Sequence, residues 1–169
     1  MYHSVNKHCI KAEDIPSWSV FLVDGRILND VEKKGENMIG HYYYEGDDLI
    51  GFTIVTKFND KLDIYILEYI ETNPSFLRKG IGSYMFNEMK TIYKEFVIES
   101  VPDTIIFHLE NGAKPLTTFS GGYLLVVSER SPLVIKNEMG FGEGFQDPDE
   151  NFVYSREEWE KYTEQWNNI

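Results

Sequence analysis

The chain has 169 residues, of which 42% are hydrophobic and 15% aromatic. This length fits one domain, the apolar content excludes a disordered chain, and no apolar run approaches the roughly 20 residues that span a bilayer. The formal net charge of −12 disfavours nucleic acid, because an acidic surface repels a polyanionic backbone. We therefore expect a single globular domain over residues 1–169, with no nucleic-acid partner and no membrane partner.

The N-terminal residues show no apolar core followed by a small-residue cleavage site, which favours a cytoplasmic protein. The one cysteine, Cys9, cannot form an internal disulfide. No Cys/His cluster has the spacing of zinc ligands, so we expect neither a metal site nor redox chemistry.

The first 37 residues give weak signals, with helical candidates that begin at Pro16 and over Asp30–Lys34. Beyond them, three runs are rich in aromatic and β-branched residues and are separated by short polar turns. These runs are Met38–Tyr44, Leu49–Phe58 and Leu62–Thr72. The pattern predicts three antiparallel strands joined by tight turns.

An amphipathic helix is predicted from about Gly82 to Phe96, because its apolar residues recur every three or four positions. Thr104–Leu109 and Tyr123–Ser128 are strand candidates, and Asn111–Gly122 has the composition of a loop.

A second short helix is predicted to open at Ser131 and Pro132 and to stop at Gly140, since serine caps a helix and proline favours its first position. Phe145 and residues 152–154 are typical of strand remnants.

The last segment begins with Ser155, followed three residues later by Glu158, which has the form of a capping box and predicts a terminal helix. Trp159, Tyr162 and Trp166 share one face of that helix. The face packs on the domain's own sheet or on a second copy of the chain, and the sequence leaves a homodimer open.

The stretch that carries chemistry lies between the third strand run and the first amphipathic helix. Gly80 and Gly82 allow a tight turn, so that an anion can approach amides that the first helical turn leaves without partners. Arg78 and Lys79 add positive charge beside them. The alternative is a turn that serves only close helix packing. Neither a Walker nor a Rossmann phosphate pattern is present.

The run Leu77-Arg78-Lys79-Gly80-Ile81-Gly82 resembles the signature of the Gcn5-related N-acetyltransferases (GNAT), Arg/Gln-x-x-Gly-x-Gly/Ala. Both glycines match, whereas Leu77 stands where the family prefers arginine or glutamine. Residues 137–141, Asn-Glu-Met-Gly-Phe, are similar to the end of a family helix that precedes the last two strands. The likeness runs from about Met38 to Tyr154.

The resemblance implies an α/β (α+β) GNAT-like fold, with a central mixed, mostly antiparallel sheet that is splayed at the cofactor site and flanked by helices. It implies an N-acetyltransferase that moves an acetyl group from acetyl-CoA, its co-substrate, to a primary amine by direct attack. By position in the family pattern, the residues that bind acetyl-CoA are Ile70, Thr72, Leu77, Arg78, Lys79, Gly80, Ile81, Gly82 and Ser83.

Glu68 matches the family position of a glutamate that acts as general base, which an amine needs because alkylamines are protonated at neutral pH. Glu68 could instead face solvent or pair with a lysine. Strand alternation places Glu71 on the opposite face, which makes it a weaker candidate. Lys136 stands where many members carry a tyrosine that protonates the leaving thiolate, so no general acid is assigned.

The resemblance implies an amine of a small molecule or of a protein as acceptor, and the acidic composition favours a cationic one. An alternative to the N-acetyltransferase function, with the same fold, is a catalytically weak module that binds or senses CoA or interacts with another protein. A second alternative, an aromatic-rich binding domain, gives the Gly80–Gly82 turn a packing role only.

Overall fold

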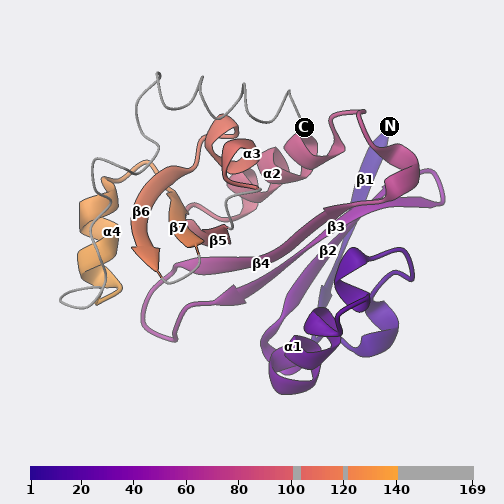
Figure 1. The fold of residues 1–169 in the computed structure, drawn as a ribbon, viewed down its shortest axis with the longest axis horizontal. Coiled ribbons are helices and arrows are strands. Elements are labelled where there is room, and N and C mark those ends of the chain that lie inside the picture. Colours follow the sequence, from indigo (N-terminus) through magenta and orange to yellow (C-terminus); the bar gives the residue numbers. More distant parts are fainter. Residues whose placement is uncertain (101–103, 120–121, 141–169) are drawn as a thin grey trace. The chain divides into compact units, whose positions relative to one another are not determined.

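The computed structural model describes residues 1–100, 104–119 and 122–140. The chain forms two compact units, Met1–Tyr93 and Lys94–Ile169, and each contains its own set of antiparallel strands (Figure 1). The α/β class with mostly antiparallel strands and flanking helices is confirmed. The single domain and the splay of the sheet stay predictions.

The first unit holds four strands in the order β1-β2-β3-β4, all neighbours antiparallel. Its strands and α-helices are β1 (Tyr2–His8), α1 (Arg26–Lys34), β2 (Ile39–Glu45), β3 (Asp48–Lys57), β4 (Tyr65–Thr72) and α2 (Ile81–Ile92). Its short 3-10 turns are η1 (Ala12–Asp14), η2 (Val20–Leu22), η3 (Gly35–Asn37) and η4 (Pro74–Phe76). The three predicted strands are therefore confirmed as β2, β3 and β4.

The prediction missed β1 and placed the helix over Asp30–Lys34 too late. Strand β1 is exposed along almost its whole length, so it lacks the alternation of apolar and polar residues that reveals a half-buried strand. Helix α1 begins after Gly25, whose φ of +73° places it in the left-handed region that glycine adopts readily.

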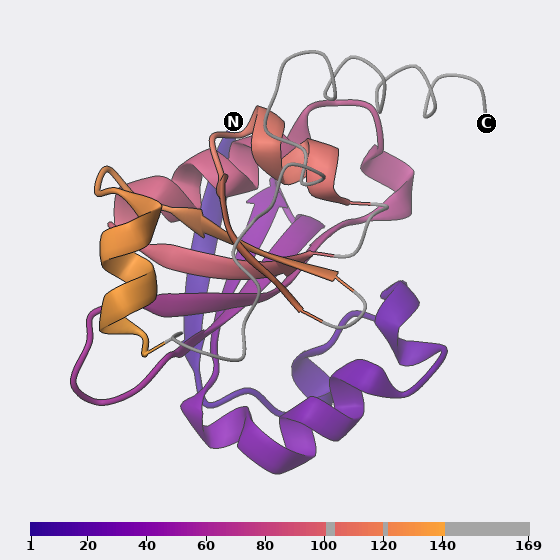
Figure 2. The same ribbon diagram turned by 60° about the vertical axis from the view of Figure 1, so that its left-hand side comes forward.

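Two apolar clusters cover opposite faces of this sheet. Buried residues of α1, including Ile27 and Val31, pack with Phe52 and Ile54 of β3 and with Tyr69 of β4. On the other face, α2 contributes Ile81 and Met85, which pack with Tyr43 and Ile50. Figures 1 and 2 show α1 and α2 on the two sides of the strands. The sheet thus separates the α1 side from the α2 side.

Helix α2 approaches the sheet closely at Gly51 of β3. A Cβ atom at Gly51 would lie 2.6 Å from the sulfur of Met85 and 2.9 Å from the carbonyl oxygen of Glu71. Glycine therefore sets the distance between the helix and the strands at this position.

The second unit contains three antiparallel strands in the order β5-β7-β6. Its elements are β5 (Phe96–Ser100), α3 (Ile105–Glu110), β6 (Lys114–Phe119), β7 (Gly122–Val127) and α4 (Pro132–Glu138). The predicted strand over Tyr123–Ser128 and the helix opened by Ser131 are confirmed, and the Ser131 hydroxyl accepts a hydrogen bond from the Leu133 amide.

Three predictions for this part of the chain are wrong. The first amphipathic helix ends at Ile92, and Phe96 begins β5 instead of ending the helix. Thr104–Leu109 is largely helix α3, in which Ile105 and His108 are buried at the helical spacing of three. The loop predicted over Asn111–Gly122 contains β6, so tertiary pairing overrode a composition rich in turn formers.

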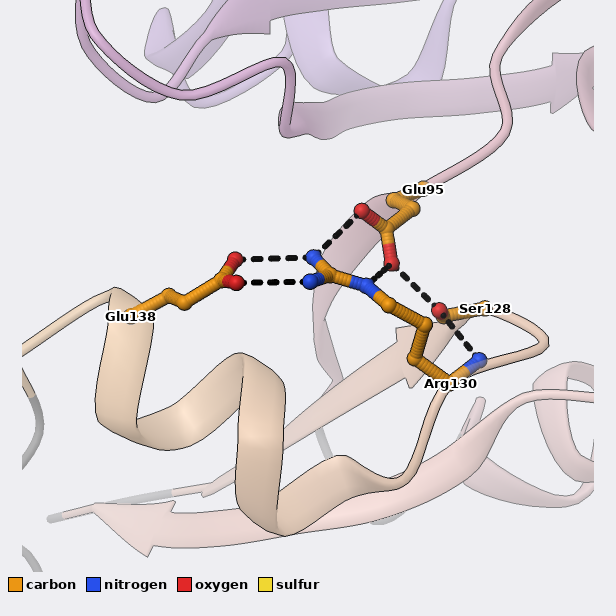
Figure 3. Close-up of polar contacts among 4 residues, drawn as sticks. All are labelled: Glu95, Ser128, Arg130 and Glu138. Atoms are coloured by element: carbon orange, nitrogen blue, oxygen red, sulfur yellow. Dashed lines mark hydrogen bonds and ion pairs between the residues drawn. The ribbon is translucent and has the colours of Figure 1, made fainter.

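Arg130 joins three segments of the second unit (Figure 3). Its guanidinium donates to both carboxylate oxygens of Glu95, before β5, and to both oxygens of Glu138, at the end of α4, at 2.6–2.8 Å. Glu95 also accepts a hydrogen bond from the hydroxyl of Ser128. The paired acceptors raise the pKa of Arg130, and the guanidinium lowers the pKa of Glu138. This cluster ties α4 to β5 and to the end of β7.

The predicted strand remnants at Phe145 and 152–154 and the terminal helix from Ser155 lie outside the described residues. Within residues 1–100, 104–119 and 122–140, no helix has the length and apolar character needed to cross a membrane. The same residues form no group of three or more His, Cys, Asp or Glu side chains suited to a metal ion.

Candidate functional site

The predicted phosphate loop leads directly into α2. After η4, Leu77 is extended and 59% exposed, and Arg78 and Gly80 adopt left-handed conformations with φ of +65° and +74°. Gly80 is the N-cap of α2 and has no side chain that could accept a hydrogen bond. The amides of Ile81, Gly82 and Ser83 in the first turn therefore have no side-chain acceptor from the N-cap residue. The first intrahelical bond runs from the Tyr84 amide to the Gly80 carbonyl.

The start of α2 has the polarity that an anion requires. The partial positive charge of the helix N-terminus is not offset here, because the first turn contains no acidic residue. Arg78 and Lys79 are exposed, and neither forms an ion pair within the described part of the chain. The ammonium of Lys79 lies 5.1 Å from the centre of the Phe76 ring, a cation–π contact. An anion at this loop would therefore meet backbone donors and two cations that form no ion pair with a carboxylate of the described residues.

A hydrogen-bonded turn fixes the chain between β4 and the loop. The side chain of Asn73 accepts from the Ser75 amide and donates to the carbonyl of Leu49 at 2.9 Å. The Asn73 amide donates to the carbonyl of Ile50 at 2.8 Å. Because Leu49 and Ile50 belong to β3, the loop is anchored to the strand next to β4.

Strand β4 carries the remaining predicted residues. Ile70 and Thr72 pair with Thr53 and Gly51 of β3. Ile70 packs on the α2 side of the sheet, and Thr72 is the last residue of the strand. Ile70 and Thr72 lie in the last three residues of β4, next to the start of the loop, because a β-strand rises only about 3.3 Å per residue.

Glu68 occupies a β-bulge in the same strand. Ile54 pairs with Tyr69 and Val55 with Leu67, which leaves Glu68 as the extra residue. Its Oε1 atom accepts a hydrogen bond from the Thr56 hydroxyl at 2.7 Å and lies 2.8 Å from the ammonium of Lys34 in α1. The Glu68 side chain is 16% exposed. The bulge thus turns this carboxylate toward the α1 side of the sheet.

Glu71 also reaches the α1 side, so the expectation of opposite faces for Glu68 and Glu71 is wrong. Simple alternation fails because the bulge at Glu68 adds one residue to the strand. Glu71 is buried and accepts from the Ser19 hydroxyl and from the Val20 amide, both at 2.6 Å. Two strong donors occupy its two oxygens, which suits an anchor for the N-terminal segment better than a base.

Tyr69, between these two glutamates, donates its hydroxyl to Asp30 of α1. Burial and the neighbouring carboxylate raise the pKa of this phenol. The chain between Ser19 and Lys34 is therefore joined to β4 by three polar links, through Glu71, Tyr69 and Glu68.

Sequence reasoning missed the partners of Glu68, although it weighed a lysine as one alternative. Lys34 precedes Glu68 by 34 residues and Thr56 precedes it by 12, so no local pattern connects them. The bulge is equally invisible, because the run around Glu68 reads as an ordinary strand.

Two histidines, His41 and His108, are buried. His41 of β2 contacts Asn6 and Tyr93 through its two ring nitrogens, and His108 lies in α3 and not in a strand. Burial lowers the pKa of each to about 4. Lys136, at the position where a family tyrosine was expected, is buried in α4.

A cavity of about 430 Å³ opens beside the last turn of α1 and η3. Lys34 is among its lining residues, together with Cys9 and Lys11, but Glu68, Thr56 and the loop before α2 are not. We therefore assign it no part in the site.

Comparison with known proteins identifies the family. Residues 11–110 match the model of the acetyltransferase (GNAT) family, a span that includes α1, Glu68 and the loop before α2. A search of curated protein sequences found no match.

Solved structures share the fold at low sequence identity. An acyl-CoA N-acyltransferase from Pseudomonas aeruginosa is 8% identical with a TM-score of 0.58, covering 76% of this chain and 100% of that one. A GNAT family acetyltransferase from Elizabethkingia anophelis with acetyl-CoA bound is 13% identical with a TM-score of 0.56, covering 74% and 97%. The PaiA N-acetyltransferase from Thermoplasma acidophilum in complex with coenzyme A is 16% identical with a TM-score of 0.50, covering 64% and 75%.

The family model covers more than half of the chain, and the glycine loop, bulged strand and α2 lie inside the matched residues. This chain belongs to the acetyltransferase (GNAT) family.

Proposed function

We propose that this chain is an acetyl-CoA-dependent N-acetyltransferase that acetylates a primary amine of a small molecule or of a protein. The observation that carries the proposal is the opening of α2. Left-handed Gly80 starts the helix without a side-chain cap, and exposed Arg78 and Lys79 stand beside it. Such an opening suits a diphosphate, which CoA carries.

The roles of the remaining residues follow from their places. The amides of Ile81, Gly82 and Ser83, with Arg78 and Lys79, hold the diphosphate. Backbone groups of Ile70 and Thr72 orient the pantetheine arm and the thioester, and Leu77 lies along the same loop.

Glu68 takes the proton from the acceptor ammonium, and Thr56 holds Glu68 in place through the bond to Oε1. Acetyl-CoA supplies the activated acetyl group. The acceptor nitrogen attacks the thioester carbon, and the thiolate of CoA leaves.

The acceptor amine reaches Glu68 as a cation, since an alkylamine with a pKa near 10 is protonated at neutral pH. The net charge of −12 attracts such molecules. This supports a cationic acceptor, such as a polyamine, an aminosugar or a lysine side chain.

Thermal melts with and without acetyl-CoA test the binding part of the proposal. A ligand at a hundred times its dissociation constant adds about 2.7 kcal/mol, which raises the midpoint by several degrees. Replacement of Gly82 by tryptophan should abolish the shift, because the new side chain fills the approach to the first-turn amides. An unchanged wild-type midpoint at millimolar acetyl-CoA would contradict the proposal.

Release of free thiol across a panel of amines tests the chemistry. The Glu68→Gln variant should keep the melting shift and lose about 100-fold or more in turnover, the usual contribution of a general base. The ion pair between Glu68 and Lys34 favours the non-catalytic alternative, since the carboxylate of Glu68 already has a cationic partner. Tight CoA binding without turnover of any amine would support a CoA-binding or sensing module instead.

A further inference from the structure

The chain itself places an amine on the proposed base. The ammonium of Lys34 lies 2.8 Å from Oε1 of Glu68, and the Thr56 hydroxyl donates to the same oxygen at 2.7 Å. The Lys34 side chain is 39% exposed and the Glu68 side chain 16% exposed. An external acceptor needs the same contact with the same carboxylate, so Lys34 occupies the place where an acceptor ammonium would bind.

Two other lysines show why Lys34 differs from an ordinary surface amine. Lys33, its neighbour in α1, is exposed and contacts no carboxylate among the described residues. Lys7 does contact a carboxylate, that of Asp14, but Asp14 belongs to η1 and not to β4. Lys34, at the end of α1, differs from both because the carboxylate that it contacts belongs to β4, the strand that leads to the loop.

We propose that Lys34 is a self-acetylation site, an internal acceptor that takes the acetyl group from acetyl-CoA bound to the same molecule. This inference rests on the proposed function. Ile70 lies two residues beyond Glu68, so at most about 7 Å of chain separates them, because the bulge at Glu68 shortens the extended strand. The flexible four-carbon stem of lysine can cover such a distance once the ammonium has lost its proton.

The reaction is balanced without any further reagent. Glu68 accepts a proton from the Lys34 ammonium, and the neutral amine attacks the carbonyl carbon of the thioester. The N–C bond forms as the C–S bond breaks, and the CoA thiolate leaves and takes up a proton. The products are acetyl-lysine and CoA. Because acetyl-CoA is bound to the molecule that carries Lys34, the transfer is unimolecular and gains the advantage of high effective concentration.

Acetylation removes the positive charge of Lys34 and with it the ion pair to Glu68. Oε1 then loses its internal cation and can accept one from outside. Lys34 and an external amine therefore compete for the carboxylate of Glu68. An external amine that binds there should slow the acetylation of Lys34.

The test uses the full chain with acetyl-CoA and no added amine at neutral pH, with the acetyl occupancy of each lysine followed by peptide mass spectrometry. We expect Lys34 to be acetylated at least about 100-fold faster than Lys33, the contribution of a positioned base. The rate should not depend on protein concentration, and an external amine that is itself acetylated should slow it.

The Glu68→Gln variant supplies the matched comparison. It should lower the rate at Lys34 to that at Lys33 and keep the melting shift with acetyl-CoA, which shows that the protein is folded and loaded. Lys33→Arg should leave the Lys34 rate unchanged.

Equal rates at Lys34 and Lys33 in the wild-type protein would overturn the inference, as would a rate that rises with protein concentration. If an added amine is acetylated while Lys34 stays unmodified, the inference fails and the proposed function stands. If acetyl-CoA neither binds nor reacts, both fail.

Discussion

Lowering the pH should destabilise the first unit through His41. This side chain is 1% exposed, with Nδ1 2.6 Å from Oδ1 of Asn6 and Nε2 2.7 Å from the hydroxyl of Tyr93. Because the Asn6 oxygen only accepts, Nδ1 carries the proton and Nε2 accepts from Tyr93. The ring is therefore neutral, and protonation would place a positive charge at a buried position and require the Tyr93 hydroxyl to accept from Nε2–H instead of donating to it.

The sign and the magnitude follow from the pKa. Burial lowers the pKa of His41 from 6.5 to about 4, so the unfolded chain takes up a proton before the folded one does. The contribution of His41 to stability is complete above pH 6.5 and is lost as the pH falls toward 4. Each titrating group changes the free energy of unfolding by about 1.4 kcal/mol per pH unit in this window, or about 3 kcal/mol across it.

Urea unfolding at several pH values between about 7 and 4.5 measures this effect, with His41→Gln as the matched variant. Glutamine cannot titrate, so the wild-type protein should lose about 1.4 kcal/mol more per pH unit than the variant. Parallel pH dependences would refute the assignment of His41 as a buried neutral histidine. His108, whose pKa burial also lowers to about 4, should give the same difference in a His108→Gln variant.

Three further predictions concern packing and anchoring. Gly51→Ala should lower the free energy of unfolding by about 1–3 kcal/mol, because the new Cβ would meet the Met85 sulfur at 2.6 Å; a stability equal to wild type in urea unfolding would show that α2 moves away freely. Glu71→Gln should cost about 1–3 kcal/mol, since one amide oxygen cannot replace both carboxylate oxygens that accept from Ser19 and Val20; the same unfolding assay checks it, and unchanged stability would argue against a link to β4. Arg130→Lys should speed amide hydrogen exchange in α4, because an ammonium cannot hold two carboxylates in bidentate fashion; identical exchange in both proteins would mean that the cluster does not anchor the helix.

The parts of the fold that the sequence predicts well are those with strong local patterns. Strands β2, β3 and β4 have aromatic and β-branched runs with polar turns between them, and Ser131 followed by Pro132 marks the start of α4. The glycine loop belongs to this class too, because Gly80 needs the left-handed conformation that glycine favours.

The parts that could not be predicted depend on contacts far apart in the chain. Strand β1 has no buried face, and β6 forms through its pairing with β7 despite its loop-like composition. At the site, the bulge at Glu68 reverses the expected direction of a side chain, and Lys34 reaches Glu68 only because α1 packs on β4. A single sequence contains no local signal for either.

We propose that amides in the first turn of α2 hold the diphosphate of acetyl-CoA, and substitution of Ser83 tests this contact most directly. The Ser83 amide lies before the first intrahelical bond, which is donated by Tyr84, so proline at this position removes a donor without breaking a bond inside the helix. Calorimetric titration with acetyl-CoA should give a dissociation constant about 10-fold or more higher for Ser83→Pro than for Ser83→Ala, which keeps the amide. Equal affinities of the two variants, with α2 intact by circular dichroism, would contradict the account.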